Sequence, residues 1–514
     1  MNLITSAAYI TPGLIAEFGK LPPSMLPVQN KRLYQHQFAL FNDKTNQVLS
    51  LPKSFKLGSF DKKILSELCV HVVYVPDGLS LGQSIIYVLN VMGCYDEPIN
   101  ILHGDTLFEY LPNECDIYTI AQTDIDYSWG KTDNNKDVYS GYFSFSSQSL
   151  LLQKIIEANY DFIKGVESYR KTRHITKVKL NHWMDFGIAN SYYRSISQMT
   201  TQRSFNNLKV NNYSLKKYST DSRKILAEAN WFTSLPKGMK HYAPSLWDSG
   251  IEGDKGFYEI EYFYLSSLAN LFIFARNPQF VWDDILASCA EFINHSFNYH
   301  PDNKTDIACQ NNQLYLPKTI ERLKIFSAES GISLDNEWTI NGTTVPSLLS
   351  IANETSAMIQ SDAKQFVTLM HGDFCFSNIL YDFKSKSIRV IDPRGIDLYG
   401  NYSIYGDLRY DVAKLAHSAI GKYDLIIAGR FNYRQVTDYN IEFHLEKNET
   451  YDYVQNSFCK LVFAEYSIEE LSTYPIMVHL FLSMLPLHAD NPLRQKAMLA
   501  NALLIYTELK KTNK

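Results

Sequence analysis

Short apolar runs alternate with helix-like stretches along the N-terminal part of the chain. The apolar runs predict strands at Asn2–Ile10, Val70–Val75, Ile99–Leu102, Ile117–Ala121 and Tyr142–Phe145. The stretches Leu81–Asn90 and Ser149–Asn159 predict helices between them. This alternation predicts an α/β layer fold with a mainly parallel sheet. Ligands of such folds bind beyond the carboxyl ends of the strands, so polar residues at those ends are candidates for function.

The pattern changes near residue 200. Two strands, a helix and a third strand are predicted in order, at Phe205–Val210, Tyr213–Lys217, Ser222–Ser234 and Tyr258–Phe263. Most segments from Leu265 onward have a helical pattern. We therefore expect a small sheet with one helix, followed by a larger helical body. This change predicts two domains, 1–198 and 199–514.

The composition is that of a folded protein. The 514 residues exceed the roughly 250–300 that one core supports. The net charge of −5 gives no global basic footprint for nucleic acid or an anionic membrane, although a local pocket can still bind phosphate. The late apolar run Tyr474–Ala489 is short and interrupted by His and Pro, so we expect a buried helix and no stable membrane insertion. The seven scattered cysteines and the absence of a signal-peptide pattern are typical of a cytoplasmic protein.

The segment Phe366–Ile391 carries the clearest chemical motif. An apolar run leads into the sequence HGD at residues 371–373, and Asn378 follows five residues after the aspartate. A polar turn and a second predicted strand then end at Asp392. An amide and two carboxylates at the ends of strands are suited to binding a metal and a phosphate ester.

Phosphoryl transfer requires an aligned hydroxyl and a divalent metal that neutralises phosphate charge. We therefore expect Asp373 to accept or orient the proton of an attacking hydroxyl. His371, the other candidate catalytic residue of this loop, is expected to brace it. Asn378 and Asp392 supply the oxygen ligands that Mg²⁺ prefers.

The sequence HGDFCFSNIL with the later VID is similar to the aminoglycoside phosphotransferase and choline kinase family, which has a protein-kinase-like fold. The segment Gly406–Leu415 is similar to the family's segment after the metal-binding aspartate, where Asp411 would support the catalytic loop. The resemblance covers roughly residues 200–490. It implies ATP as the donor and a sugar, a polyol or an amino alcohol such as choline as the acceptor.

A kinase-like fold also implies a cation on the small sheet that pairs with an acid on the adjacent helix. Lys217 is the candidate to hold the phosphates of ATP, with Glu228 as its partner. Lys216 stays open as an alternative, because neighbouring residues of a strand face opposite sides. Glu261–Tyr264 is expected to be the hinge that meets adenine through backbone groups, beginning with Glu261.

Residues 5–37 resemble the start of the sugar-phosphate nucleotidyltransferase family, whose first strand leads into a glycine-rich loop and a Leu-Pro-Val motif. The resemblance implies that Gly82 and Gln83 help to recognise a nucleotide base. It also implies that Asp105 and Asp185 bind Mg²⁺, which polarises the α-phosphate of a nucleoside triphosphate while a sugar phosphate attacks.

The chain departs from this family in its phosphate-binding loop. Residues 7–13 contain one glycine, Gly13, where the family has several, and the family's lysine falls on Pro23. Backbone amides of such a loop normally cradle a triphosphate. Two interpretations remain open: Lys20 supplies the catalytic positive charge by another route, or the domain has lost transferase activity and only binds.

Together the resemblances imply a Rossmann-like nucleotidyltransferase domain of α/β class followed by a protein-kinase-like α+β domain. Chains of this kind resemble bacterial capsule or surface-polysaccharide biosynthesis proteins. The expected function is bifunctional: a kinase that uses ATP and Mg²⁺, and a transferase that uses a second triphosphate (CTP, GTP or UTP). Partners would be nucleotides and a small-molecule substrate, with a homo-oligomer left open. The alternatives are a kinase with a non-catalytic N-terminal domain and a non-catalytic scaffold.

Overall fold

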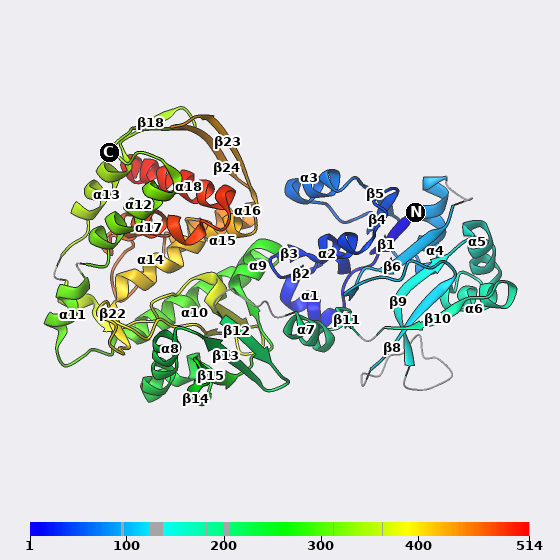
Figure 1. Cartoon of the computed structure of the whole chain (residues 1–514), viewed down its shortest axis with the longest axis horizontal. Helices are drawn as coiled ribbons and strands as arrows, with labels where there is room; N and C mark the ends of the chain where they lie inside the picture. Colours follow the sequence, from blue (N-terminus) through cyan, green and yellow to red (C-terminus); the bar gives the residue numbers. More distant parts are fainter. Residues whose placement is uncertain are drawn as a thin grey trace. The chain divides into compact units, whose positions relative to one another are not determined.

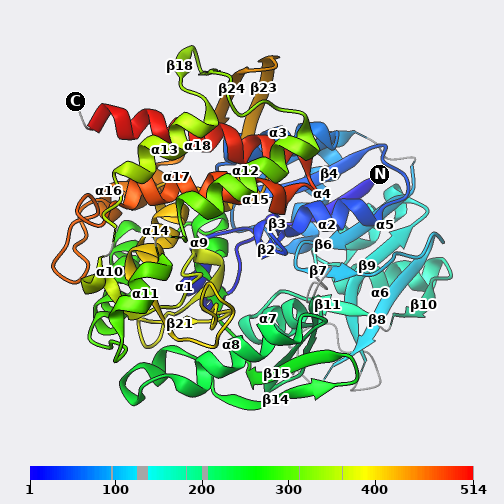
Figure 2. The same cartoon turned by 60° about the vertical axis from the view of Figure 1, so that its left-hand side comes forward.

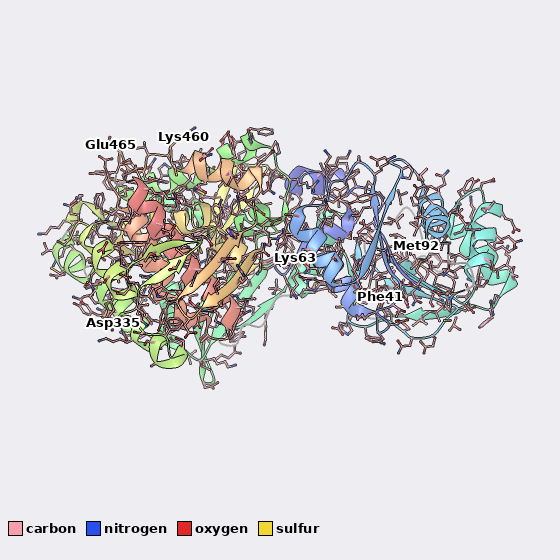
Figure 3. All side chains as sticks on the ribbon, turned by 90° about the horizontal axis from the view of Figure 1, so that it is seen from above. Phe41, Lys63, Met92, Asp335, Lys460 and Glu465 are labelled. Carbon is pink, nitrogen blue, oxygen red and sulfur yellow. The ribbon has the colours of Figure 1, made fainter. Side chains whose placement is uncertain are left out.

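The computed structural model describes the whole chain except residues 94–96, 124–136, 181, 200–205, 312, 362 and 513–514. The chain divides into two compact units (Figure 1). The first unit comprises Met1–Met199 and Phe274–Arg276, and the second comprises Thr200–Ile273 and Asn277–Lys514. Charged side chains such as Lys63, Asp335 and Lys460 lie at the surfaces of their units (Figure 3).

A seven-stranded sheet forms the centre of the first unit. Its order is β10 (Thr176–Lys179), β8 (Ile117–Gln122), β9 (Asp137–Phe145), β6 (Ile99–His103), β1 (Asn2–Thr5), β4 (Gln47–Pro52) and β5 (Val70–Val75). Neighbouring strands are parallel except where β9 pairs with β6 and β8. The prediction of an α/β fold with a mainly parallel sheet is confirmed. The predicted strand Asn2–Ile10 is wrong beyond Thr5, because the chain leaves the sheet there to cross its carboxyl edge.

Helices α4 (Leu81–Met92), α5 (Gln148–Glu157) and α6 (Phe162–Thr172) pack against this sheet. Their apolar side chains form one core with sheet residues such as Leu3, Ile101 and Phe143. The other helices of the unit are α1 (Pro12–Phe18), α2 (Leu33–Leu40), α3 (Ser59–Glu67) and α7 (Ala189–Gln198). Short strand pairs complete it: β2 (Pro27–Val28) with β3 (Lys31–Arg32), and β7 (Thr106–Phe108) with β11 (Trp183–Asp185).

The second unit begins with a small antiparallel sheet of four strands. Its order is β12 (Asn206–Val210), β13 (Ser214–Ser219), β15 (Lys255–Glu261) and β14 (Leu246–Glu252), and helix α8 (Ser222–Ser234) packs on it. The first position of the predicted strand Phe205–Val210 lies outside the described residues. Strand β14 was not predicted, because this edge strand is mostly exposed and lacks apolar alternation. The small sheet with one helix is nevertheless as expected.

The larger part of the second unit is helical, as predicted (Figure 2). Its helices are α9 (Leu268–Phe274), α10 (Gln279–Phe297), α11 (Lys304–Asn311), α12 (Leu316–Ser330), α13 (Leu348–Ala357), α14 (Leu408–Ala419), α15 (Tyr423–Ile427), α16 (Glu449–Phe458), α17 (Thr473–Ser483) and α18 (Pro492–Thr512). Helix α17 is buried along most of its length and packs against α12, α14 and α18. Among the described residues, no helix combines the length and apolar character that crossing a membrane requires.

Short strands are inserted among these helices. A four-stranded sheet that the pattern did not predict contains β18 (Thr343–Val345), β17 (Trp338–Ile340), β24 (Asn440–Leu445) and β23 (Phe431–Thr437). The hairpin of β20 (Ile379–Asp382) and β21 (Ser387–Val390) pairs with β16 (Ser266–Ser267), while β19 (Val367–Leu369) pairs with β22 (Tyr405–Asp407). Strand β19 and this hairpin carry the HGD motif and the residues that follow it.

The loop after Asp392 approaches the backbone of α8 very closely at Gly395. This glycine has φ +63°, and an added Cβ would lie 2.0 Å from the carbonyl oxygen of Ala227. A side chain at this position therefore meets both an unfavourable backbone conformation and a backbone atom that cannot move aside.

We predict that Gly395→Ala lowers the free energy of unfolding of the second unit well beyond the roughly 1–2 kcal/mol that left-handed backbone alone costs. Gly253→Ala is the matched control, since Gly253 has φ +66° and nothing within 4 Å of an added Cβ. Urea denaturation of both variants measures the difference. Equal losses in the two variants would show that the contact with α8 does not constrain the loop.

Candidate functional site

The backbone of the HGD motif is held by a carboxylate from another element. Asp411, in the first turn of α14, accepts the N–H groups of His371 at 2.6 Å and Gly372 at 2.8 Å. Asp411 is fully buried, and burial raises its pKa to about 7 against the effect of these two donors. Gly372 has φ +82°, which favours glycine at this turn. The loop therefore has one defined backbone path.

His371 is buried with both ring nitrogens in use. Its Nε2 lies 3.0 Å from the carbonyl oxygen of Ile391, and its Nδ1 accepts the N–H of Asp373 at 3.2 Å. Because a carbonyl only accepts, Nε2 carries the proton, so the ring is neutral. Burial lowers the pKa of His371 to about 4, in agreement with a neutral ring. These contacts are those of a side chain that braces the loop.

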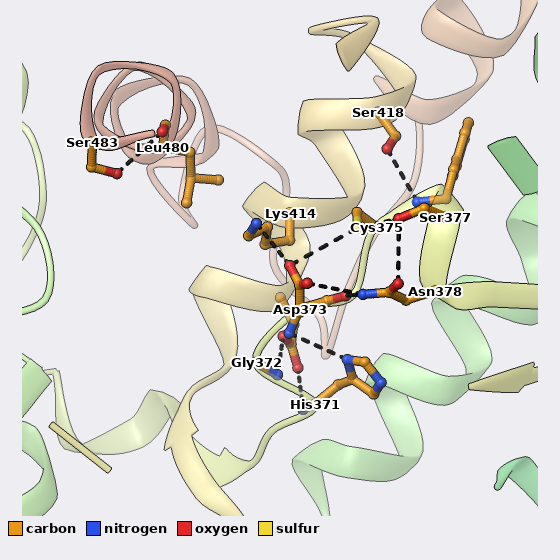
Figure 4. A network of polar contacts seen from close by, with 12 residues as sticks. His371, Gly372, Asp373, Cys375, Ser377, Asn378, Lys414, Ser418, Leu480 and Ser483 are labelled. Carbon is orange, nitrogen blue, oxygen red and sulfur yellow. Dashed lines mark hydrogen bonds and ion pairs between the residues drawn. The ribbon is translucent and has the colours of Figure 1, made fainter. Parts of the chain in front are cut away.

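Asp373 lies between two donors (Figure 4). Its Oδ1 forms an ion pair of 2.7 Å with Nζ of Lys414, and its Oδ2 accepts a hydrogen bond of 2.9 Å from Nδ2 of Asn378. Burial acts to raise the pKa of Asp373, but the Lys414 ammonium outweighs it and holds that pKa well below its ordinary value. The side chain still keeps 41% of its accessible surface, so the carboxylate faces solvent. The sequence analysis assigned no role to Lys414. Its position one helical turn after Asp411 was the one feature of the sequence that pointed to a role in this loop.

The two predicted metal ligands lie at adjoining ends of the β20–β21 hairpin. Asn378 precedes β20 and Asp392 follows β21, and the N–H of Ile391 donates to the carbonyl oxygen of Asn378 at 3.0 Å. Because Nδ2 of Asn378 is directed at Asp373, its Oδ1 is left to accept, and the hydroxyl of Ser377 donates to it at 3.3 Å. Among the described residues, no group of three or more His, Cys, Asp or Glu side chains is arranged for a metal. One amide oxygen and one carboxylate nevertheless suit Mg²⁺ that also binds phosphates and water.

The structure brings Lys217 and Glu228 together. Nζ of Lys217 lies 2.7 Å from Oε2 of Glu228 and 3.1 Å from Oδ1 of Asp392, which also accepts the hydroxyl of Tyr258 at 3.3 Å. The side chains of Lys217 and Glu228 are 6% and 3% exposed. Lys216, the alternative, faces the other side of β13 and pairs at the surface with Glu252 at 3.2 Å. Lys217 is therefore the lysine that reaches the end of the hairpin.

The predicted hinge has part of its backbone already in use. The N–H of Glu261 donates to the carbonyl oxygen of Ser245, and the N–H of Tyr262 donates to that of Tyr213, at 2.9 and 2.8 Å. Those two N–H groups are consequently not open to adenine. The carboxylate of Glu261 accepts the N–H of Ser245 at 3.4 Å, which ties the end of β15 to the start of β14.

In the first unit, Asp105 and Asp185 meet across Gly187. An added Cβ on Gly187 would lie 2.9 Å from Oδ2 of Asp105 and 3.2 Å from Oδ1 of Asp185. The pairing of β7 with β11 and the bond from the N–H of Phe186 to the carbonyl of Asp105 set this position. Burial, and secondly the charge of Asp185, raise the pKa of Asp105 to about 7. Two neighbouring carboxylates are a donor set that suits one divalent cation.

A cavity of about 180 Å³ opens beside Asp105 at the carboxyl edge of the sheet. Its lining includes Ser6, Ser50 and Ser84 together with the backbone of Ala7 and Ala8. The sequence analysis did not identify Ser6 and Ser50, since no motif marks them, whereas Ser84 follows Gly82 and Gln83 in the segment that resembles a base-recognition region. The three serines place hydroxyl groups where a polar ligand of this sheet would lie.

Gly82 and Gln83 do not line that cavity but a different one, of about 570 Å³. Gln83 closes the first turn of α4, its Oε1 accepting the N–H of Ser80 at 2.9 Å. Gly82 packs so closely on Tyr160 that an added Cβ would lie 2.3 Å from its carbonyl oxygen. Both residues thus have local structural reasons to be present, beside the predicted role in recognising a base.

Lys20 is likewise not among the residues that line the Asp105 cavity. It is exposed, and its Nζ lies 4.2 Å from the centre of the Tyr9 ring. In the phosphate-loop region, the N–H of Ser6 is taken by the hydroxyl of Ser50 at 3.0 Å, and that of Ile10 by the carbonyl of Leu21 at 2.9 Å. The loop therefore offers fewer free amides than its length suggests.

No protein-family model and no curated protein sequence matches the chain. Among solved structures it is similar to a UDP-glucose pyrophosphorylase complexed with UDP-glucose, at 13% identity over 38% of this chain and 97% of that one, with a TM-score of 0.29. It is also similar to an aminoglycoside-3'-phosphotransferase of type VIII, at 14% identity over 54% of this chain and 89% of that one, with a TM-score of 0.33. A glucosamine kinase in complex with glucosamine, ADP and inorganic phosphate matches at 11% identity over 62% and 83%, with a TM-score of 0.33. These are the kinds of protein that the sequence motifs resemble.

We predict that Lys217→Met lowers the free energy of unfolding of the second unit by about 3 kcal/mol, because it leaves buried Glu228 without its nearest cation. Lys216→Met is the matched control, and its loss should be much smaller, since its ion pair is exposed to solvent. Urea denaturation measures both.

The loss of unfolding free energy in Lys217→Met is also expected to depend on pH. Burial raises the pKa of Glu228, and Lys217 opposes that rise. Without Lys217 the pKa of Glu228 rises further. An acid whose pKa is higher in the folded than in the unfolded state lowers the free energy of unfolding as pH rises through its folded-state pKa. The deficit should therefore be larger at about pH 7 than at about pH 5. A deficit independent of pH would contradict this account of the pair.

Proposed function

We propose that the second unit is an ATP-dependent kinase that phosphorylates a small hydroxyl compound. The observation that carries the proposal is the position of Asp373, which faces solvent between Lys414 and Asn378 and beside the hairpin end that holds Asp392. Phosphoryl transfer to a hydroxyl uses a carboxylate that the acceptor can reach, oxygen ligands for a metal, and a lysine for the phosphates. Asp373, the pair Asn378 and Asp392, and the buried Lys217 are the candidates for these parts.

In the proposed reaction, the acceptor hydroxyl oxygen forms a bond to the γ-phosphorus of ATP. The bond from that phosphorus to the bridging oxygen breaks, and ADP leaves with the electron pair. The hydroxyl proton passes to Asp373 and then to water. Because its pKa is depressed by Lys414, Asp373 is a weak base, so its main contribution is to orient the hydroxyl.

Asn378 and Asp392 are the residues that would hold Mg²⁺, which would supply neutralisation of the phosphate charge. Lys217 would hold the phosphates of ATP from the small sheet, with Glu228 keeping its side chain in place. His371 and Asp411 keep the loop in the conformation that presents Asp373.

We further propose that the first unit couples the phosphorylated product to a second nucleotide. An oxygen of the phosphate monoester would attack the α-phosphorus of CTP, GTP or UTP, and pyrophosphate would leave. Asp105 and Asp185 are the residues that would hold the divalent cation there. Phosphorylation followed by nucleotide transfer supports a role of this protein in capsule or surface-polysaccharide synthesis. The competing proposal is a non-catalytic binding unit, supported by the contact of Lys20 with the Tyr9 ring and by its absence from the lining of the Asp105 cavity.

We predict that Asp373→Asn lowers kcat for acceptor-dependent ADP release by about 10²–10⁴-fold, because the hydroxyl loses its orienting carboxylate. Asp382→Asn, in the turn of the same hairpin, is the control and should retain the activity. The measurement is ADP release over a panel of sugars, polyols, amino alcohols and hydroxy acids. Unchanged turnover in Asp373→Asn, or no ATP turnover with any acceptor, would favour a non-catalytic scaffold.

For the first unit, we predict that Asp105→Asn abolishes pyrophosphate release while ADP release by the second unit is kept. The assay supplies each triphosphate together with the product of the kinase reaction. Absence of pyrophosphate with CTP, GTP and UTP in the wild-type protein would contradict transferase activity and support the binding unit.

A further inference from the structure

Three cationic side chains converge beside the catalytic loop around the ring of Tyr410, on α14. The guanidinium carbon of Arg394 lies 4.5 Å from the centre of this ring, and Nζ of Lys318, on α12, lies 5.8 Å from it. Lys414 follows Tyr410 by four residues, so both project from the same side of α14. The ring thus marks a place where α12, α14 and the loop after Asp392 bring positive charge together.

Arg394 connects this cluster to the reacting centre. Its N–H donates to the carbonyl oxygen of His371 at 2.8 Å. Its side chain runs across Gly372: an added Cβ there would lie 2.5 Å from Cβ and 3.4 Å from Nε of Arg394. The guanidinium is therefore held next to the residue that precedes Asp373, on the side of the loop that faces Tyr410.

The positive charge of the cluster exceeds the negative charge near it. Lys414 is paired with Asp373, and Asp411 is occupied by two backbone N–H groups. In the part of the chain that the structure describes, neither Lys318 nor Arg394 forms an ion pair with a carboxylate. Burial acts to lower the pKa of Arg394, but Tyr410, Asp373 and Asp411 outweigh it and raise that pKa from beyond ion-pair distance. Among the described residues, both cations thus lack a carboxylate in direct contact, although Arg394 is balanced in part by these more distant groups.

The surrounding groups respond to this excess. The charge of Tyr410 acts to raise the pKa of Lys318, but burial together with Arg394, Lys414 and Arg322 outweighs it and lowers that pKa. Burial acts to raise the pKa of Tyr410, yet Arg394, Lys318 and Lys414 lower it to about 8. Both directions are those of groups in a positive field.

We propose that this cluster binds the negatively charged group of the acceptor, so that the kinase substrate is an anionic hydroxyl compound: a hydroxy acid or a sugar or polyol phosphate. The inference rests on the proposed kinase activity and names its substrate class. A planar guanidinium and an ammonium recognise carboxylate and phosphate alike. The anion would offset the mutual repulsion of the cations and hold the hydroxyl toward Asp373.

The same geometry disfavours an amino alcohol. A quaternary ammonium is held by open aromatic faces. Here two protein cations already lie over the ring of Tyr410. An amine would further need a carboxylate, and that of Asp373 is paired with Lys414.

The test is a matched set of acceptors on one carbon frame: glycerol, glycerate, glycerol 3-phosphate and 3-amino-1,2-propanediol. ADP release gives kcat and KM for each, and the set is repeated with glucose, glucuronate, glucose 6-phosphate and glucosamine. We expect kcat/KM for an anionic member to exceed that of its neutral analogue about tenfold or more, with the amine lowest. Comparison of the carboxylate with the phosphate shows which anion the site takes. A neutral or amine acceptor that is preferred overturns the inference while the kinase proposal stands.

Lys318→Met should raise the KM of the anionic acceptor about tenfold or more, with the KM of ATP unchanged and with Lys318→Arg restoring most of the loss. Lys324→Met, an exposed lysine of the same helix, is the matched control. A rise in the KM of ATP instead would assign the cluster to the nucleotide and overturn the inference.

A binding measurement separates this inference from the proposed catalysis. Calorimetric titration of glycerate, glycerol 3-phosphate, glucuronate and glucose 6-phosphate into Asp373→Asn and into the Asp373→Asn, Lys318→Met double variant requires no turnover. Binding of an anion that the second substitution weakens supports the anion site even if ADP release fails. Absence of binding by all four anions overturns it.

Discussion

Helix α14 fixes the conformation of the HGD loop through two charged side chains one turn apart. Asp411 accepts the N–H groups of His371 and Gly372, and Lys414 pairs with the carboxylate of Asp373. The first contact positions the backbone and the second positions the side chain. These hydrogen bonds offset part of the free energy that burial of Asp411 costs, and they join the helix and the loop into one structural element.

The second link joins the small sheet to the same loop. Lys217 of β13 bonds both Glu228 of α8 and Asp392 beyond β21. On α8 the indole N–H of Trp231 donates to the carbonyl oxygen of Met370 at 2.8 Å, directly before the HGD motif. The contact of Gly395 with α8 is close enough to exclude any side chain. A change in the position of α8 would therefore shift the positions of both Asp373 and Asp392.

The two units have opposite local charge. The Asp105 cavity is lined by that carboxylate and by three serines, Asp185 lies close to Asp105 at Gly187, and Lys20 is not among the lining residues. The surroundings of Asp373 gather Lys318, Arg394 and Lys414 around one tyrosine. The first arrangement attracts cations, and the second attracts an anion. This contrast is consistent with two different ligands within one chain whose net charge is −5.

The amino-acid sequence by itself determined the layer fold, the small sheet with its helix, and the local motif of Asp373, Asn378 and Asp392. These follow from periodicity and from spacing within one hairpin, which a short stretch of chain contains completely. Tertiary structure alone decided between Lys217 and Lys216, because the face of β13 that is buried depends on what packs against it. It also supplied Lys414, Lys318 and Arg394, and it gave Gln83 a capping hydrogen bond. Residues from distant segments have no characteristic spacing in the sequence that would mark them as neighbours. Their distance in space is set by the fold and not by the number of residues between them.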